Sequence, residues 1–135
     1  MVIISSKWEK DRLPVYNKLR QLFEQLESST KKVPINIKRG KIAEVENLIM
    51  AAMVKICYAD AAKDDSDASI KERLDFIDEV QQDLNEIKVN VRLLHDLKYI
   101  KDQGFDALAG YEDNVDSQLI GWRNATEKRL KVENK

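Results

Sequence analysis

The sequence predicts an all-α protein, an up-down-up-down antiparallel four-helix bundle, and two observations support this class. Glycine and proline are scarce, with four and two among 135 residues, and charged residues make up 35%. This composition is typical of long helices. Apolar residues also recur at helical spacing in four segments, and no alternating strand pattern competes with them. Short links between these segments predict antiparallel neighbours.

The first helix is expected to begin at Pro14, because proline lacks the N–H group that would be unpaired in the first turn. It is expected to stop at residues 28–30, and Pro34 predicts a loop since it biases Val33 away from helical angles. The apolar face of this helix consists of Val15, Leu19, Leu22, Phe23 and Leu26.

The second helix is expected to start between Asn36 and Lys38, with Asn36 as its N-cap. It should end in the polar turn 63–67. Its apolar residues are Ile42, Val45, Leu48, Ile49, Ala52, Met53, Ile56 and Cys57. Several alanines in this segment would let a neighbouring helix approach closely.

The third helix is predicted to open with a capping box at Ser69 and Glu72. An apolar stripe then runs from Ile70 to about Tyr99, and roughly thirty residues at 1.5 Å each make a helix about 45 Å long. Its outer surface is predicted to be acidic, with Glu72, Asp75, Asp78, Glu79, Asp83 and Glu86.

A tight polar turn is predicted at residues 101–104, and the fourth helix is expected to run from Asp102 or Gln103 to Lys128. Gly104 and Gly110 should each weaken it by roughly 1 kcal/mol relative to alanine. Residues after Ala125 are nearly all polar and are expected to fray. The inward side chains are predicted to be Phe105, Leu108, Tyr111, Val115, Leu119 and Trp122.

The chain is therefore interpreted as one domain, with an N-terminal arm at 1–13, the four-helix bundle at 14–125 and a polar C-terminal tail at 126–135. No apolar run approaches the roughly 18 to 20 residues that span a membrane, and the opening residues are too short for a signal peptide. A single cysteine, Cys57, excludes an internal disulfide. A cytoplasmic protein is the expectation.

Charge is uneven along the chain although the net charge is −1. Residues 1–63 hold 12 Lys or Arg and 7 Asp or Glu, a net of +5, whereas residues 64–135 hold 11 and 17, a net of −6. Antiparallel helices interleave the two halves, so this asymmetry need not appear on the surface. A nucleic-acid partner is permitted but is not indicated by overall charge.

Four short motifs occur in order between residues 13 and 123. They are LPVYNKL at 13–19, TKKVP at 30–34, RLLHDLK at 92–98 and GW at 121–122. With them the chain resembles a small four-helix-bundle family that has two groups of members. One group is the accessory variability proteins, or accessory variability determinants, of diversity-generating retroelements. The other is the proteins encoded in ribosomal RNA intervening sequences.

The resemblance implies a function that composition alone does not indicate. The retroelement members form a pentameric barrel of bundles and bind a reverse transcriptase and its template RNA. By resemblance we expect a homopentamer that acts as a non-enzymatic, RNA-binding adaptor, with a reverse transcriptase and a structured RNA as partners.

The intervening-sequence group implies an alternative, a protein-only interaction or scaffold module with no direct nucleic-acid binding. The near-neutral charge and the acidic third helix favour it. Where relatives commonly carry an Ile-Gly-Arg segment, this chain reads Val115-Asp116-Ser117, so an arginine is missing from the fourth helix.

The candidate binding residues are basic. Five of them fall within eleven positions around the first loop: Lys31, Lys32, Lys38, Arg39 and Lys41. Such a cluster can meet phosphates, which adds salt-dependent affinity without sequence information. The alternative is a solvated loop and helix start. No aromatic residue is interleaved with the cluster, so base stacking is not expected there.

Arg92, Lys98 and Lys101 join the candidates because they lie in the third motif and the turn after it. The alternative for Arg92 is a structural ion pair with Asp96, four residues away on the same helix face. Two aromatic residues, Tyr16 and Trp122, are predicted to anchor the core or a subunit interface.

The remaining reactive residues do not indicate an enzyme. His95 is a lone histidine without a nucleophile motif or a Glu-x-x-His repeat. Cys57 is expected to be a buried, inert thiol. The acidic turn 64–67 lacks the central glycine of a calcium loop, and Phe76 occupies the position of its closing glutamate. We expect no catalytic residue, metal, cofactor or small-molecule substrate.

Overall fold

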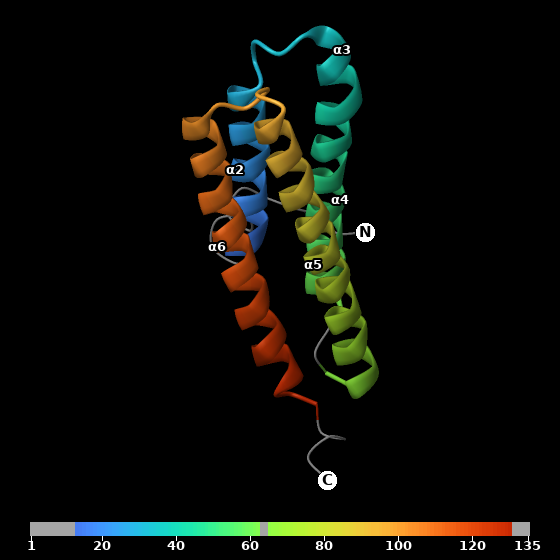
Figure 1. Ribbon diagram of the computed structural model, residues 1–135. Coiled ribbons are helices and arrows are strands. Elements are labelled where there is room, and N and C mark those ends of the chain that lie inside the picture. Colours follow the sequence, from blue (N-terminus) through green and yellow to red (C-terminus); the bar gives the residue numbers. More distant parts are fainter. Residues whose placement is uncertain (1–12, 63–64, 131–135) are drawn as a thin grey trace.

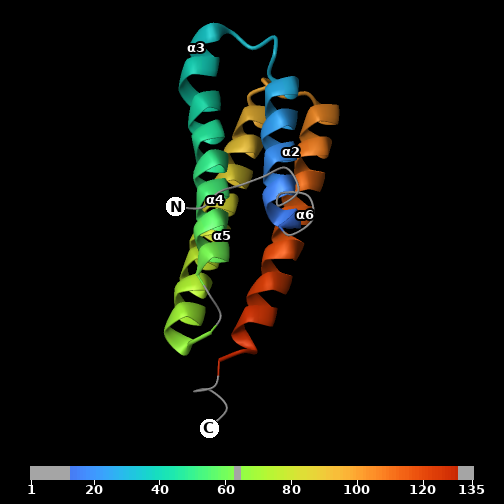
Figure 2. The same ribbon diagram turned by 180° about the vertical axis from the view of Figure 1, so that it is seen from behind.

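The computed structural model describes residues 13–62 and 65–130, and over these residues the chain is all-α, with four long helices and no strand. The helices lie side by side, as Figures 1 and 2 show from opposite sides. All four contribute to one buried core, for example through Leu22, Ile49, Leu84 and Leu108. The predicted all-α class is confirmed. Within the same residues, no helix combines the length and the apolar character needed to cross a membrane.

The first helix, α2, runs from Pro14–Ser29 as predicted, with Pro14 in its first turn. Its end is closed by Thr30, whose hydroxyl donates a hydrogen bond to the Leu26 carbonyl at 2.7 Å. The buried residues Val15, Leu19, Leu22 and Leu26 confirm most of the predicted stripe. Phe23 is partly buried against the same core.

The second helical segment consists of α3 (Ile35–Ile37), a π-helical turn (Lys38–Ile42) and α4 (Ala43–Ala61). The predicted N-cap, Asn36, is wrong because the helix already begins at Ile35, directly after Pro34. The π turn has a packing consequence. Ile37 and Ile42 are five residues apart, and the wider turn lets both contact the core.

The third helix, α5, spans Asp67–Asp96 and starts earlier than predicted. The predicted capping box is wrong, because Ser66 is the N-cap and its hydroxyl accepts a hydrogen bond from the Ser69 amide at 3.2 Å. The apolar stripe stops at Leu94, since α5 ends two residues later. Leu97, which we expected to face inward, is 56% exposed.

One acidic residue of α5 lies inside rather than on the outer surface. Asp83 is buried, and its Oδ2 atom lies 2.8 Å from Nζ of Lys55 on α4. The expected outward position of Asp83 is therefore wrong. The lysine compensates for the burial of the carboxylate.

The turn between the third and fourth helices lies at residues 97–101, three to four residues earlier than predicted. Lys98 has a φ of 70°, the left-handed conformation that glycine usually supplies after a helix. The amides of Tyr99 and Lys98 donate to the carbonyls of Leu94 and His95, both at 2.9 Å. This hydrogen-bond pair is a Schellman motif, which needed no glycine here and was therefore missed.

The fourth helix, α6, spans Asp102–Glu127, close to the predicted bounds. The expected fraying after Ala125 is wrong for the residues up to 130, because Thr126 is buried and Leu130 packs with Ile70 and Leu74. Gly104 allows α6 to start close to the end of α2. A Cβ atom at this position would lie 2.7 Å from Oγ of Ser29.

The end of the molecule where α4 and α6 finish is held by arginines. Arg73 donates to the Ala59 and Ala62 carbonyls at 2.9 and 2.6 Å, which satisfies the last turn of α4. Its guanidinium also lies 5.8 Å from the ring centre of Trp122. Arg123 on α6 pairs with Asp78 on α5 at 2.7 Å.

The two predicted aromatic anchors, Tyr16 and Trp122, are partly buried against the core. Cys57 is buried, as predicted. Three sequence interpretations fall outside the described residues: the order of the N-terminal arm up to residue 12, the position of Trp8 and the contribution of Asp64 to the acidic turn.

Candidate nucleic-acid interface

The α2–α3 connection and the α5–α6 turn lie at the same end of the molecule, the upper end in Figure 1. This arrangement brings residues 31–34 close to residues 98–101, although they are far apart in sequence. A pocket of about 690 Å³ opens between the two connections. We call it the loop-end pocket. Its lining includes Gln25, Ser28, Ser29, Lys31, Lys32, Pro34, Lys98, Tyr99, Lys101, Gln103 and Gly104.

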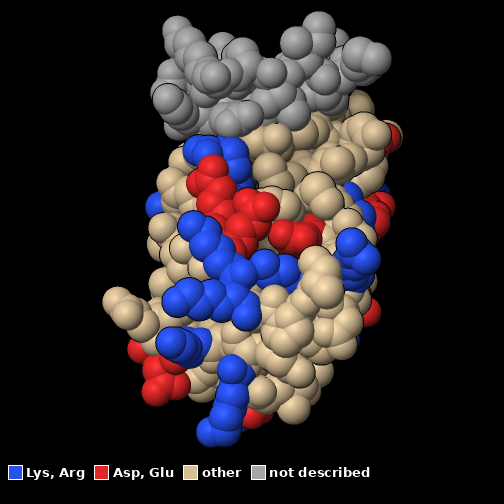
Figure 3. Space-filling view, turned by 90° about the horizontal axis from the view of Figure 1, so that it is seen from above, with Lys and Arg blue, Asp and Glu red and all other residues tan. Residues whose placement is uncertain are grey.

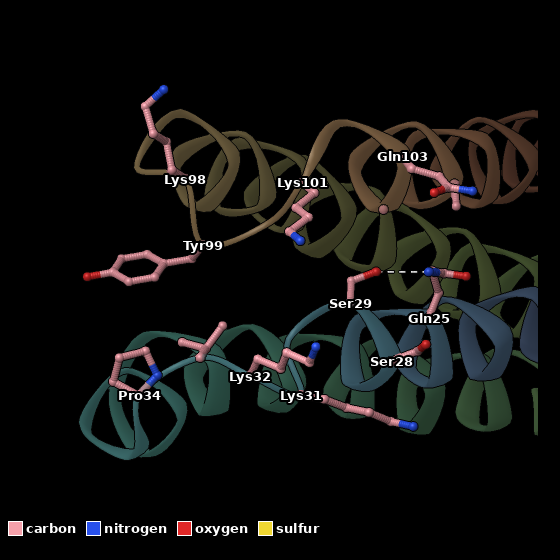
Figure 4. A pocket seen from close by; sticks show the side chains of 13 residues that line it. Gln25, Ser28, Ser29, Lys31, Lys32, Pro34, Lys98, Tyr99, Lys101 and Gln103 are labelled. Atoms are coloured by element: carbon pink, nitrogen blue, oxygen red, sulfur yellow. Dashed lines mark hydrogen bonds between the residues drawn. The ribbon is translucent and has the colours of Figure 1, made fainter.

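Four of the eight predicted basic site residues line this pocket: Lys31, Lys32, Lys98 and Lys101. Figure 4 shows Lys32 and Lys101 pointing into the gap from opposite sides, whereas Lys98 points away from it. The wall on the α2 side is polar, and Ser29 accepts a hydrogen bond from Gln25 at 2.8 Å. The two lysines that face the gap are therefore placed to contact one shared ligand.

The other predicted basic residues lie outside the pocket. Lys38 donates to the Lys31 carbonyl at 2.5 Å, so it supports the loop backbone. Lys41 pairs with Glu44 at 2.8 Å. Arg39 lines a separate hollow that also contains Glu44 and Glu86. The basic cluster of the sequence is thus divided in the structure, and acidic residues accompany its second part.

The predicted ion pair between Arg92 and Asp96 is present at 4.0 Å, and both side chains are exposed. Such a pair contributes only a few tenths of a kcal/mol. Arg92 does not line the loop-end pocket. Seen from above in Figure 3, Lys and Arg side chains gather in a band across this end of the molecule, with Asp and Glu beside them.

The first turn of α6 borders the pocket through Gln103 and Gly104. The first intrahelical backbone bond of α6 runs from the Phe105 amide to the Lys101 carbonyl at 2.9 Å. The amides before Phe105 therefore carry the partial positive charge of a helix N-terminus. This charge adds to that of the lysines and favours an anion.

Sequence reasoning missed Tyr99 as a site residue. We expected no aromatic residue beside the basic cluster, but the turn places Tyr99 in the wall of the pocket with Lys31 and Lys32. That expectation is wrong because it considered only neighbours in sequence. The signal was available in the adjacent turn, since Tyr99 lies between the two candidate lysines 98 and 101.

His95 has a structural position at the base of the same turn. Its Nε2 atom lies 2.8 Å from Oδ1 of Asp102, and its ring stacks on Phe105 with 4.2 Å between ring centres. These contacts join the end of α5 to the start of α6. No group of three or more His, Cys, Asp or Glu side chains within 13–62 and 65–130 is placed to hold a metal ion.

Glu112 is a buried acid that the apolar pattern did not reveal. It is 6% exposed, and its Oε2 atom has no hydrogen-bond partner among the described residues. Burial raises the pKa of its carboxyl to about 7; nearby Lys88 opposes this and Asp113 adds to it. The spacing of Glu112 from Leu108 and Val115 is helical, and that spacing could have identified it as inward-facing.

The outer face of α4 is apolar. Met50, Val54 and Tyr58 recur at every fourth position and are 44%, 49% and 51% exposed. The 19 residues of α4 include four charged ones, which project to the flanks of the helix at 100° per residue. A helix that is apolar on both its inner and outer faces is typical of a buried helix, so this surface favours contact with another protein.

Comparison with models of protein families and with curated proteins found no match to this chain. The resemblance to the retroelement and intervening-sequence proteins therefore stays a prediction, and the functional argument depends on the geometry of the surface.

Proposed function

We propose that this chain is a cytoplasmic, non-enzymatic adaptor that binds RNA at its loop end and acts beside a reverse transcriptase, as the family resemblance implies. The observation that carries the proposal is the convergence of Lys31 and Lys32 with Lys98 and Lys101 around one pocket. Two separate connections supply these lysines. A solvated loop would explain one pair, but it gives no reason for both pairs to border the same hollow.

Lysines that neutralise phosphates produce binding with a characteristic salt dependence. For single strands, the logarithm of the binding constant falls with the logarithm of salt concentration by about 0.7 for each phosphate neutralised. Because Lys32 and Lys101 face the gap, they are expected to make two of these contacts. The exposed positions of the other lysines make their contributions smaller and more easily screened.

The test is the anisotropy of a labelled structured RNA titrated with the protein across a salt series. The double variant Lys32→Gln, Lys101→Gln should bind more weakly at low salt, and its salt slope should be smaller by roughly 1. The matched control is Lys71→Gln, Lys128→Gln, which removes the same charge at the opposite end of the molecule. Equal weakening by both double variants would show nonspecific charge attraction and would refute the loop-end site.

The protein-only alternative is favoured by a different observation, the apolar outer face of α4. We include self-association in the proposal, with up-down-up-down bundles assembled into a ring through this face and a pentamer as the size that the resemblance implies. Val54→Glu should shift the sedimentation coefficient toward that of a single chain. Asn114→Glu, an exposed change on α6, should leave it unchanged. Assembly through α4 without any RNA binding would favour the scaffold function.

A further inference from the structure

We propose that the loop-end pocket holds an unpaired nucleotide of an RNA strand, with its base stacked on Tyr99 and a phosphate between Lys32 and Lys101. This inference rests on the proposed function and makes it more specific. It names the form of RNA, single-stranded rather than duplex, and a residue outside the basic cluster that recognises it.

The shape of the site favours a nucleotide over a duplex backbone. Its volume of about 690 Å³ lies within the range of pockets that enclose small organic ligands. A duplex keeps its bases stacked inside the helix and presents only phosphates and riboses along its edge. A single strand is flexible and can turn one base out into a hollow between two loops.

The position of Tyr99 favours stacking. Its backbone is held by the hydrogen bond from its amide to the Leu94 carbonyl at 2.9 Å, and its side chain is only partly buried against the core. Figure 4 shows the ring extending from the turn across the pocket side of the structure, with its hydroxyl outward. A fixed, half-exposed aromatic ring beside lysines is the arrangement that single-strand binding proteins use for base stacking.

The backbone of the turn supports the same interpretation. Lys98 adopts a φ of 70°, which costs a lysine more free energy than it would cost a glycine. Unfavourable conformations of this kind tend to occur at functional sites. Here the conformation reverses the chain after α5, so that Tyr99 and Lys101 border the pocket while Lys98 points away.

Polar groups near the ring can contact a base or ribose without selecting one base. Gln25 and Gln103 carry amides that both donate and accept, and Ser28 carries a hydroxyl. Because these side chains are flexible and bifunctional, we infer weak sequence preference. The site should therefore discriminate by strandedness more strongly than by sequence.

The test compares a labelled single-stranded RNA of mixed sequence with the same strand annealed to its complement. The single strand should bind at least tenfold more tightly. Tyr99→Leu should weaken single-strand binding roughly tenfold or more and leave duplex binding unchanged, whereas Tyr99→Phe, which keeps the ring, should bind as the unmodified protein does. Tyr58→Leu removes a tyrosine on α4, far along the sequence from the turn, and serves as the control.

A second readout reports the stacking itself. A single strand carrying 2-aminopurine should lose fluorescence on binding to the unmodified protein and to Tyr99→Phe, but not to Tyr99→Leu. Thermal denaturation of each variant checks that the fold is intact. Equal affinity for both RNA forms, with no effect of Tyr99→Leu, would overturn the nucleotide site while the phosphate-binding adaptor stands. Absence of binding to either form would overturn both proposals.

Discussion

Glu112 makes the stability of this protein depend on pH in a direction that can be predicted. Its carboxyl group lies on the inner face of α6, 6% exposed, and replaces an apolar residue in the series that runs through Leu108, Val115 and Leu119. Ionising it there removes hydration that the surroundings do not replace. Glu112→Gln keeps the shape of the side chain and removes the charge, so it isolates this cost.

The magnitude follows from the raised pKa of Glu112, about 7 against an ordinary value of 4.5. In the folded state Glu112 keeps its proton up to higher pH than in the unfolded state. Unfolding free energy therefore falls as pH rises from about 4.5 to about 7, and the full penalty is present above that range. At about 1.4 kcal/mol for each pH unit, the difference is worth about 3 kcal/mol.

The assay is urea denaturation of the unmodified protein and of Glu112→Gln at pH 4.5 and at pH 8. At pH 8 the variant should be more stable by roughly 1 to 3 kcal/mol, with the upper value reached only if the new amide finds hydrogen-bond partners. At pH 4.5 the two should nearly coincide. Glu72→Gln, an exposed change on α5, is the control. A stability difference of the same size at both pH values would refute the reasoning, because it would not arise from ionisation.

Three further predictions test local features of the fold by thermal or urea denaturation. Gly104→Ala should destabilise by about 1 to 3 kcal/mol through overlap with the facing serine of α2, whereas Gly110→Ala, which has open space around it, should stabilise by up to about 1 kcal/mol; a gain at both sites would contradict the close approach. Ser66→Ala should cost about 1 kcal/mol and more than Ser69→Ala, because Ser66 is the side chain that caps α5; the reverse order would restore the cap predicted from sequence. Lys98→Gly should stabilise by about 1 kcal/mol through relief of its left-handed conformation, and a loss of stability would argue against that conformation.

The loop end and the outer face of α4 separate two kinds of partner on one small protein. Lysines and a tyrosine from two connections form the first surface, while uncharged side chains form the second. Since substitutions at Lys32 and Val54 are expected to affect different measurements, the adaptor and scaffold functions can be tested independently. An adaptor that joins RNA to a protein would need both surfaces.

The bounds of the helices were largely determined by the sequence. Pro14 opens α2, residues near 102 and 128 bound α6, and the burial of Cys57 follows from its place on an apolar stripe. These features depend on local rules, namely the missing N–H of proline and the 3.6-residue period of the helix. Where two local signals competed, as with Ser66 and Ser69, the sequence did not distinguish them.

Only the tertiary structure decided which distant residues meet. Periodicity indicates that a position faces inward, but not which side chain lies opposite, so the pairing of Asp83 with Lys55 and the closeness of Gly104 to Ser29 had no sequence signal. The loop-end pocket has the same origin. Lys32 and Lys101 share it because the helices between them return the chain to the same end of the molecule, and that distance is set by how the helices pack.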